Sequence, residues 1–333
     1  MRYACPAGGS VGKKEEATLH VHALPAFDRP FRLAGYALLA LAIAGFTYLH
    51  HFQPHLLRVP DPADVTTWKN PSFEETCVYD RMTDEEKAKV RAEGVPKNTI
   101  PELLFSEVFS IFIAALCFAH VRKYYGSWMA NCFLIGSFVF TGMQESIWIL
   151  FGRFTGSSAS QGIGEEVFGT YFFSRGGLWF IETPVYVCLG WFVWAYAAVW
   201  VAGKVFPRMN LVGRAFVGAL IPMLMDVWID PVFTSPEHMN WVWAKGDCLL
   251  LFGIPHPNFL GWFFLIFLFA ILWEQLPKWE RHWGRLKATL VFFATLVAAE
   301  LGILAFLFPW CFALKQILLL AGAQQGLKLP PGW

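Results

Sequence analysis

The most regular feature of the chain is a series of long apolar runs separated by shorter polar segments. Seven runs approach 20 residues, at 33–53, 103–121, 128–152, 178–203, 212–230, 259–276 and 288–311. A helix of about 20 apolar residues crosses the roughly 30 Å hydrocarbon layer of a bilayer. The strands of a membrane β-barrel would alternate apolar and polar residues, and these runs do not. The pattern predicts an all-α fold, a polytopic bundle of about seven transmembrane helices.

The polar segments divide the chain into four parts. Residues 1–30 form a polar N-terminal tail, 31–125 hold two spans and a long extramembrane loop at 54–100, 126–312 form the membrane core, and 313–333 form a C-terminal tail. Within the loop, Thr83 and Glu86 have the spacing of a capping box at the start of a short helix. The segment between the third and fourth spans is broken by Gly and Ser but apolar around 167–173. This favours a re-entrant segment at 160–175, packed against protein.

Composition agrees with a membrane protein and argues against other classes. Hydrophobic residues make up 56% of the chain, aromatic residues 17% and charged residues only 15%. The net charge is +1, and no basic tract is interleaved with aromatic residues, so nucleic-acid binding is not expected. The seven cysteines include no CxxC pair, and therefore predict neither a zinc site nor a disulfide framework.

The distribution of Lys and Arg predicts the orientation in the membrane. Alternate segments carry fourteen basic residues on one side against five on the other, when the long 54–100 loop is left out. The richer side is expected to face the cytoplasm. The N-terminus belongs to that side, so the N-terminus is predicted to be cytoplasmic and the C-terminus to lie across the membrane.

Carboxylic acids inside the apolar runs are the candidate chemistry. Asp226 and Asp230 are four residues apart, which places them on one face of a helix, and Pro231 is expected to end that helix. Glu145 lies deep in the third span and Glu182 one turn inside the fourth. An ionised carboxyl at the bilayer centre costs about 3 kcal/mol, so acids without a matched cation are expected to hold protons. A protonated carboxyl in an aromatic cavity can protonate an alkene, and Trp and Tyr faces can stabilise the resulting cation.

Other uses of these acids remain open from the residues alone. They can hydrogen-bond between helices and only fix the packing, or form the proton or cation site of a transporter. The DxxxD spacing also resembles the Asp-rich Mg²⁺ motif of prenyl-diphosphate enzymes. That chemistry needs a second acidic cluster and basic residues for the diphosphate, and only Lys245 follows nearby. A metal site is therefore disfavoured.

A chain of short motifs between about 145 and 275 carries a family resemblance. The motifs are Glu145, Phe168-Gly169-Thr170-Tyr171, Pro184, Trp191, Asp226, Asp230-Pro231, Trp241-Val242-Trp243, Gly253-Ile254-Pro255 and Asn258-Phe259-Leu260-Gly261-Trp262. In this order and spacing they resemble the integral-membrane carotenoid biosynthesis family, whose characterised members are carotenoid 1,2-hydratases, including bisanhydrobacterioruberin hydratase.

The resemblance implies a hydro-lyase that adds water to the terminal double bond of an acyclic carotenoid or related polyisoprenoid, without a cofactor, in the bacterial inner membrane. It assigns Asp226 and Asp230 as proton donor and partner, and Glu145 or Glu182 to water activation. Substrate-binding residues would be Tyr171, Trp191, Trp241, Trp243, Asn258 and Trp262.

Two other functions fit the same features. An isoprenoid cyclase or isomerase begins with the same protonation but excludes water. A non-catalytic subunit would keep the fold and bind carotenoid or lipid in its pocket. Membrane lipid is an expected partner in every case, and the 54–100 loop is a candidate docking segment for a membrane protein.

Overall fold

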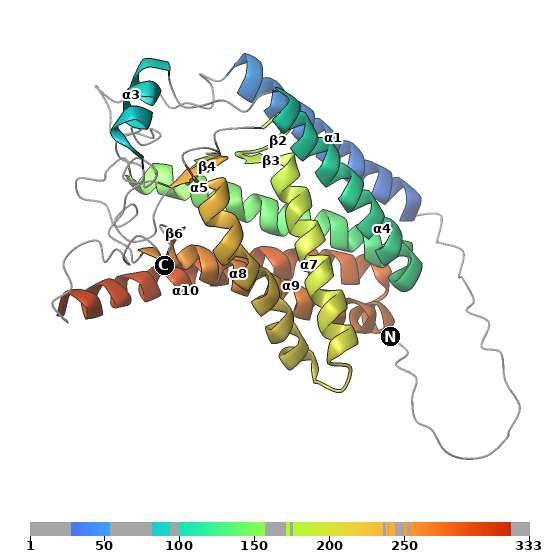
Figure 1. The fold of residues 1–333 in the computed structure, drawn as a ribbon. Helices are drawn as coiled ribbons and strands as arrows, with labels where there is room; N and C mark the ends of the chain where they lie inside the picture. Colours follow the sequence, from blue (N-terminus) through green and yellow to red (C-terminus); the bar gives the residue numbers. More distant parts are fainter. Residues whose placement is uncertain are drawn as a thin grey trace, which may run out of the picture.

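A computed structural model of the chain describes residues 28–53, 82–93, 100–156, 171–173, 176–235, 238, 240–243, 250–251 and 254–320. Long helices dominate these residues (Figure 1). They are α1 (Asp28–Phe52), α3 (Asp84–Glu93), α4 (Ile100–Ser137), a π-helical turn (Phe138–Gly142), α5 (Met143–Gly156), α7 (Val185–Val205), α8 (Leu211–Phe233), α9 (His256–Trp283) and α10 (Arg285–Leu320). Short antiparallel ribbons pair β1 (Tyr171–Phe173) with β4 (Trp241–Trp243), β2 (Trp179–Phe180) with β3 (Thr183–Pro184), and β5 (Leu250–Leu251) with β6 (Ile254–Pro255). The prediction of an all-α membrane bundle is confirmed.

The second and third predicted spans lie on one long helical segment that is kinked at Gly126. Six helical stretches of the described residues are long and apolar enough to cross a membrane, and the second, Leu104–Ile149, has 46 residues. At about 1.5 Å per residue, that stretch is more than twice as long as a bilayer requires. Gly126 divides it with a φ of 86° and a ψ of 164°, a conformation that glycine adopts without steric cost. In Figure 1 the teal part of α4 and the green part leading to α5 run in different directions.

The predicted start of the fourth span at residue 178 is wrong. The chain forms the β2–β3 hairpin first, and α7 begins only at Val185. Pro184 stands before the helix in an extended conformation and pairs with Trp179 across the hairpin. Glu182 therefore lies in the hairpin turn, next to Ile181 with its positive φ of 58°, and not inside a helix as predicted.

Side chains of α1 and α4 hold this hairpin in place. The His50 ring stacks on Trp179 with centroids 3.9 Å apart, and its Nε2 lies 2.7 Å from the Ile181 carbonyl oxygen. Glu107 Oε1 accepts a hydrogen bond of 2.8 Å from the Gly177 backbone N–H. Because buried backbone donors need partners, a carboxylate at the start of α4 satisfies the turn that precedes β2.

The helices of the membrane core pack through aromatic side chains. Phe133 makes edge-to-face contacts with Phe192 of α7 and with Phe269 and Trp273 of α9, at centroid distances of 5.2, 4.9 and 5.0 Å. Such pairs stabilise a core by about 1 kcal/mol each beyond the burial of their area. α9 also packs along both α8 and α10. The bundle thus has one core shared by α4, α7, α8, α9 and α10.

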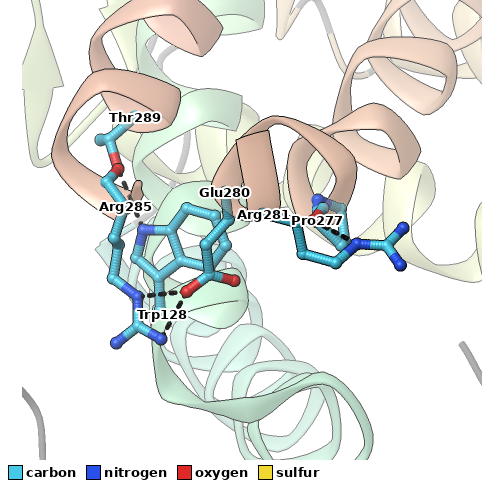
Figure 2. A network of polar contacts seen from close by, with 6 residues as sticks. All are labelled: Trp128, Pro277, Glu280, Arg281, Arg285 and Thr289. Atoms are coloured by element: carbon cyan, nitrogen blue, oxygen red, sulfur yellow. Dashed lines mark hydrogen bonds and ion pairs between the residues drawn. The ribbon is translucent and has the colours of Figure 1, made fainter. Parts of the chain in front are cut away.

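Basic side chains gather where α7 and α9 end and α8 and α10 begin, which we call the basic end. They are Arg122, Lys123, Lys204, Arg208, Arg214, Lys278, Arg281, Arg285 and Lys287. Figure 2 shows part of it: Arg285 binds Glu280 Oε1 through Nη2 at 2.6 Å, and its guanidinium lies over the Trp128 ring. Trp128 Nε1 donates to Thr289 at 3.0 Å. These contacts fix the turn between α9 and α10 against α4.

The capping box predicted in the 54–100 loop is confirmed. The Thr83 backbone N–H donates to Glu86 Oε2 at 2.8 Å, and the Glu86 N–H donates to Thr83 Oγ1 at 3.2 Å. The backbone N–H and the hydroxyl of Thr83 both donate to Glu86 Oε2, and they hold the pKa of Glu86 below its ordinary value. Of the re-entrant segment predicted at 160–175, residues 160–170 and 174–175 lie outside the described residues, whereas Tyr171–Phe173 form strand β1.

Candidate functional site

The opposite end of the bundle, where α7 and α9 begin and α8 ends, brings the predicted site residues together. The β1–β4 ribbon places Tyr171 opposite Trp243 and Phe173 opposite Trp241. The Tyr171 and Trp243 rings lie 4.4 Å apart. Cross-strand aromatic pairs of this kind stabilise an isolated ribbon. Two motifs about 70 residues apart in the sequence thereby form one aromatic wall.

Asp226 and Asp230 lie on one face of the last turns of α8 and share a single donor. Asn258 Nδ2 donates to Asp226 Oδ2 at 2.8 Å and to Asp230 Oδ2 at 2.6 Å. Asn258 stands in the first turn of α9, right after Pro257, a residue that favours the start of a helix. The prediction that Pro231 ends α8 is wrong, because the helix continues to Phe233. The helix tolerates the missing N–H of this proline and continues for two residues beyond it.

Glu145 is bound on both carboxyl oxygens by uncharged donors. Trp191 Nε1 donates to Oε1 at 2.9 Å, and the Tyr171 hydroxyl donates to Oε2. Glu145 follows the π-helical turn Phe138–Gly142 by three residues. Such turns insert an extra residue into a helix and often occur at functional sites, because they change which face the following side chains occupy.

These residues surround a cavity of about 300 Å³, which we call the main cavity. All six predicted substrate-binding residues line it, together with Asp230 and Glu145. The described residues that line it are Phe109, Ser110, Ile113, Glu145, Tyr171, Phe173, Tyr186, Val187, Gly190, Trp191, Val193, Trp194, Ile229, Asp230, Phe233, Trp241, Trp243, Asn258 and Trp262. Of the described residues that line it, none is Lys, Arg or His.

Two of the predicted catalytic residues do not line the main cavity. Asp226 is fully buried, and the Asn258 amide joins it to Asp230, which lines the cavity. Glu182 is buried in the β2–β3 hairpin, where its backbone N–H donates to Ser146 Oγ at 3.2 Å. The geometry thus separates Asp230 and Glu145, which line the cavity, from Asp226, which does not.

A second, water-sized cavity adjoins the first. It measures about 20 Å³ and is lined by Gln144, Glu145, Trp148, Tyr171, Trp191, Trp243, Pro257, Asn258, Gly261, Trp262 and Leu265. We call it the small cavity. Six of these residues line both cavities, so Glu145 and Asn258 stand in the wall between them.

Sequence reasoning missed Gly190 and the α4 side of the main cavity. A side-chain Cβ built at Gly190 would meet no atom within 4 Å, so this glycine opens space along α7. A glycine inside a helix destabilises it by about 1 kcal/mol relative to alanine. A glycine in the middle of a predicted span was therefore a sequence signal for open space at this position. Phe109 and Ile113 of α4 lie on a helix distant in sequence, and no local pattern marks them as part of the site.

The arrangement can perform acid chemistry on an apolar ligand. Asp230 faces a mostly aromatic cavity, and one oxygen of Asp226, Oδ1, is buried without a hydrogen-bond partner among the described residues. Burying two negative charges on one amide donor would be costly, so one proton held by the pair is the favoured state. Trp191 and Trp262, with ring centroids 4.0 Å apart, add aromatic faces that can stabilise a cation.

Comparison with known proteins gives a family and no individual relative. The sequence model of the family described as "Carotenoid biosynthesis protein" matches residues 105–322. This range includes both aspartates, Asn258, Glu145 and every described residue that lines either cavity. Neither a curated protein nor a solved structure matches the chain. Since the match spans well over half of the chain, this integral membrane protein belongs to the carotenoid biosynthesis protein family.

Proposed function

We propose that the protein is a membrane-embedded hydratase that adds water to the terminal double bond of an acyclic carotenoid or related polyisoprenoid. One observation carries the proposal: the Asn258 amide joins two aspartate carboxyls, and one of them faces an apolar cavity. An acid in such a place has no charged ligand to bind. In an apolar ligand, a carbon–carbon double bond is the group that this acid can protonate.

The shape of the main cavity supports a ligand that enters from the bilayer. Phe109 of α4 and Phe233 of α8 line the cavity and are also 52% and 39% exposed. On a membrane span, exposed apolar side chains contact lipid. The end group of a polyene would occupy the cavity while the rest of the chain remains between α4 and α8 or in the bilayer. An isoprenoid of this length needs no soluble carrier to reach the site.

Asp230 is the proposed proton donor. Its O–H bond breaks as a new C–H bond forms at the less substituted carbon of the terminal double bond, which leaves a tertiary carbocation. The electron pair of the alkene forms the C–H bond, and Asp230 becomes a carboxylate. Asp226 is a positioning residue, because the Asn258 amide binds both aspartates and so holds Asp230 in place. Once Asp230 has given its proton, the aspartate pair carries one more negative charge. General acid catalysis of this kind contributes about 10² to 10⁴ in rate.

Water completes the reaction with Glu145 as the base. A water oxygen bonds to the cationic carbon, and one of its protons passes to a Glu145 oxygen, giving a tertiary alcohol. The Trp191 and Tyr171 hydrogen bonds fix the orientation of the Glu145 carboxyl before this step. Return of that proton to Asp230 restores the starting state, so the net change is one water added per double bond.

The experiment that tests this proposal is product analysis after co-expression with lycopene biosynthesis. The wild-type protein is expected to add one water per end group, measured by mass spectrometry, and Asp230→Asn is expected to add none. A product of unchanged mass but altered chromatographic retention would contradict hydration and favour a cyclase or isomerase. Unaltered lycopene beside folded wild-type protein would contradict the proposal and favour a binding subunit.

A further inference from the structure

The small cavity has the size of one water molecule. Its volume of about 20 Å³ exceeds the roughly 10–15 Å³ that a single water requires. It shares Glu145 and Asn258 with the main cavity, since both residues line the two cavities. A molecule held there would contact these two side chains from the small cavity, whereas a polyene would contact them from the main cavity.

Gln144 supplies a polar atom that lacks a partner. Its Oε1 is buried and accepts no hydrogen bond from the described residues, although the side chain lines the small cavity. An unpaired buried acceptor costs about 1–3 kcal/mol. A water in the cavity would donate one hydrogen to Gln144 Oε1 and the other to Glu145, whose oxygens keep acceptor capacity beyond the bonds from Trp191 and Tyr171.

Gly261 keeps this cavity open. It is buried in α9, yet a Cβ built on it would meet no atom within 4 Å. A buried position with open space at Cβ is unusual, because protein interiors are close-packed. The backbone thus leaves room where an alanine methyl group would fill the space of the water.

We propose that the small cavity stores the water that adds to the substrate, with Gln144 as its positioning residue. This inference rests on the proposed function. Separate compartments for water and polyene supply one water on one face of the cation and keep bulk water away from it. The water oxygen bonds to the tertiary carbon, its proton passes to Glu145, and its remaining hydrogen stays bound to Gln144 until the alcohol leaves.

Filling the cavity should separate protonation from hydration. Membranes that contain the full-length protein are incubated with lycopene in D₂O, and mass spectrometry follows both hydration and deuterium uptake into recovered lycopene. In Gly261→Ala, hydration is expected to fall at least about tenfold. Asp230 still delivers a deuteron to the less substituted carbon of the terminal double bond. Without water, the Asp230 carboxylate removes the original hydrogen of that same carbon from the cation and the double bond re-forms, so lycopene is recovered with deuterium in its end groups.

Three further variants control the interpretation. Gly302→Ala makes the same change in α10, at a helical glycine with no atom near its Cβ and no part in either cavity, and should leave both readouts unchanged. Gln144→Met keeps the size of the side chain but removes the acceptor, and should reproduce the Gly261→Ala result. Gln144→Glu, which keeps an acceptor at that position, should restore part of the hydration.

Wild-type hydration in Gly261→Ala and Gln144→Met would overturn the stored-water inference and leave the hydratase proposal standing. If these variants, with folded protein present, lose both hydration and deuterium uptake, the inference is also overturned, since Asp230 should still deliver deuterium. Wild-type protein that neither hydrates nor deuterates lycopene would instead overturn the proposed function.

Discussion

The two ends of the bundle hold their carboxyl groups in different ways. At the basic end, Glu274 and Glu280 pair with Arg214 and Arg285 at 2.7 and 2.6 Å. At the site end, the described donors to Glu145, Asp226 and Asp230 include indole, phenol and amide groups and no Lys or Arg. An arginine partner favours the charged form of a carboxyl group. A carboxyl held by neutral donors can gain and lose a proton, which is what chemistry at that end requires.

The comparison also separates positions that stabilise the fold from positions that serve a ligand. The arginine pairs join α8 to α9 and α9 to α10, and each pairs a guanidinium with a carboxylate. The site end leaves space: a main cavity of about 300 Å³ and glycines at 190 and 261 with nothing near their Cβ positions. Natural cores are rarely left open without a function for the space.

The largest expected effect comes from removing the proton at the site end. Asp230→Asn should lower the rate of hydration by about 10³, because an amide cannot act as the acid. The matched change at the basic end, Glu274→Gln, should leave the rate per folded molecule unchanged. Initial rates in membranes, normalised to folded protein, measure both. Equal losses in the two variants would contradict the distinction between the ends.

Breaking an arginine pair should affect stability instead. Arg214→Met leaves Glu274 buried and without its cation, and should lower the free energy of unfolding by about 3 kcal/mol. The surviving folded protein should hydrate at the wild-type rate. Thermal unfolding in detergent micelles reports the first quantity and membrane assays the second. A loss of rate in folded Arg214→Met would show that the two ends are coupled.

Closing the main cavity should reduce activity without loss of fold. A leucine at position 190 would project into the open space along α7, and misplacement of the end group by about 1 Å can cost about 10²-fold. Leucine favours a helix more than glycine, so the fold should be retained. Gly302→Leu is the control, since that glycine lines neither cavity. Wild-type activity in Gly190→Leu would place the substrate elsewhere.

Local pattern predicted the helices and the acid pair well. The spacing of Asp226 and Asp230 fixes a shared face whatever surrounds the helix, and the apolar runs fix the spans. The residues 178–184 were misassigned because an apolar run of that kind reads as the start of a helix. Contacts with residues far away in the sequence, among them Glu107 and His50, hold it as a hairpin.

The site as a three-dimensional object needed tertiary structure. The motif resemblance grouped Tyr171, Trp243 and Asn258, but their meeting depends on the β1–β4 ribbon and on the crossing of α8 with α9. The sequence could not show that Asp230 lines the main cavity and Asp226 does not, because both aspartates lie on the same face of α8. Nor could the division of the interior into two cavities, which depends on side chains from distant helices.

Infrared spectroscopy of the carboxyl groups tests the central claim most directly. A protonated carboxyl has a carbonyl stretching band that shifts on transfer to D₂O, and a carboxylate paired with arginine has none. Difference spectra between the wild type and Asp230→Asn in lipid membranes should show the loss of such a band, and those between the wild type and Glu274→Gln should show no loss. No band lost in Asp230→Asn would contradict the account, because the aspartate pair would then hold no proton to give.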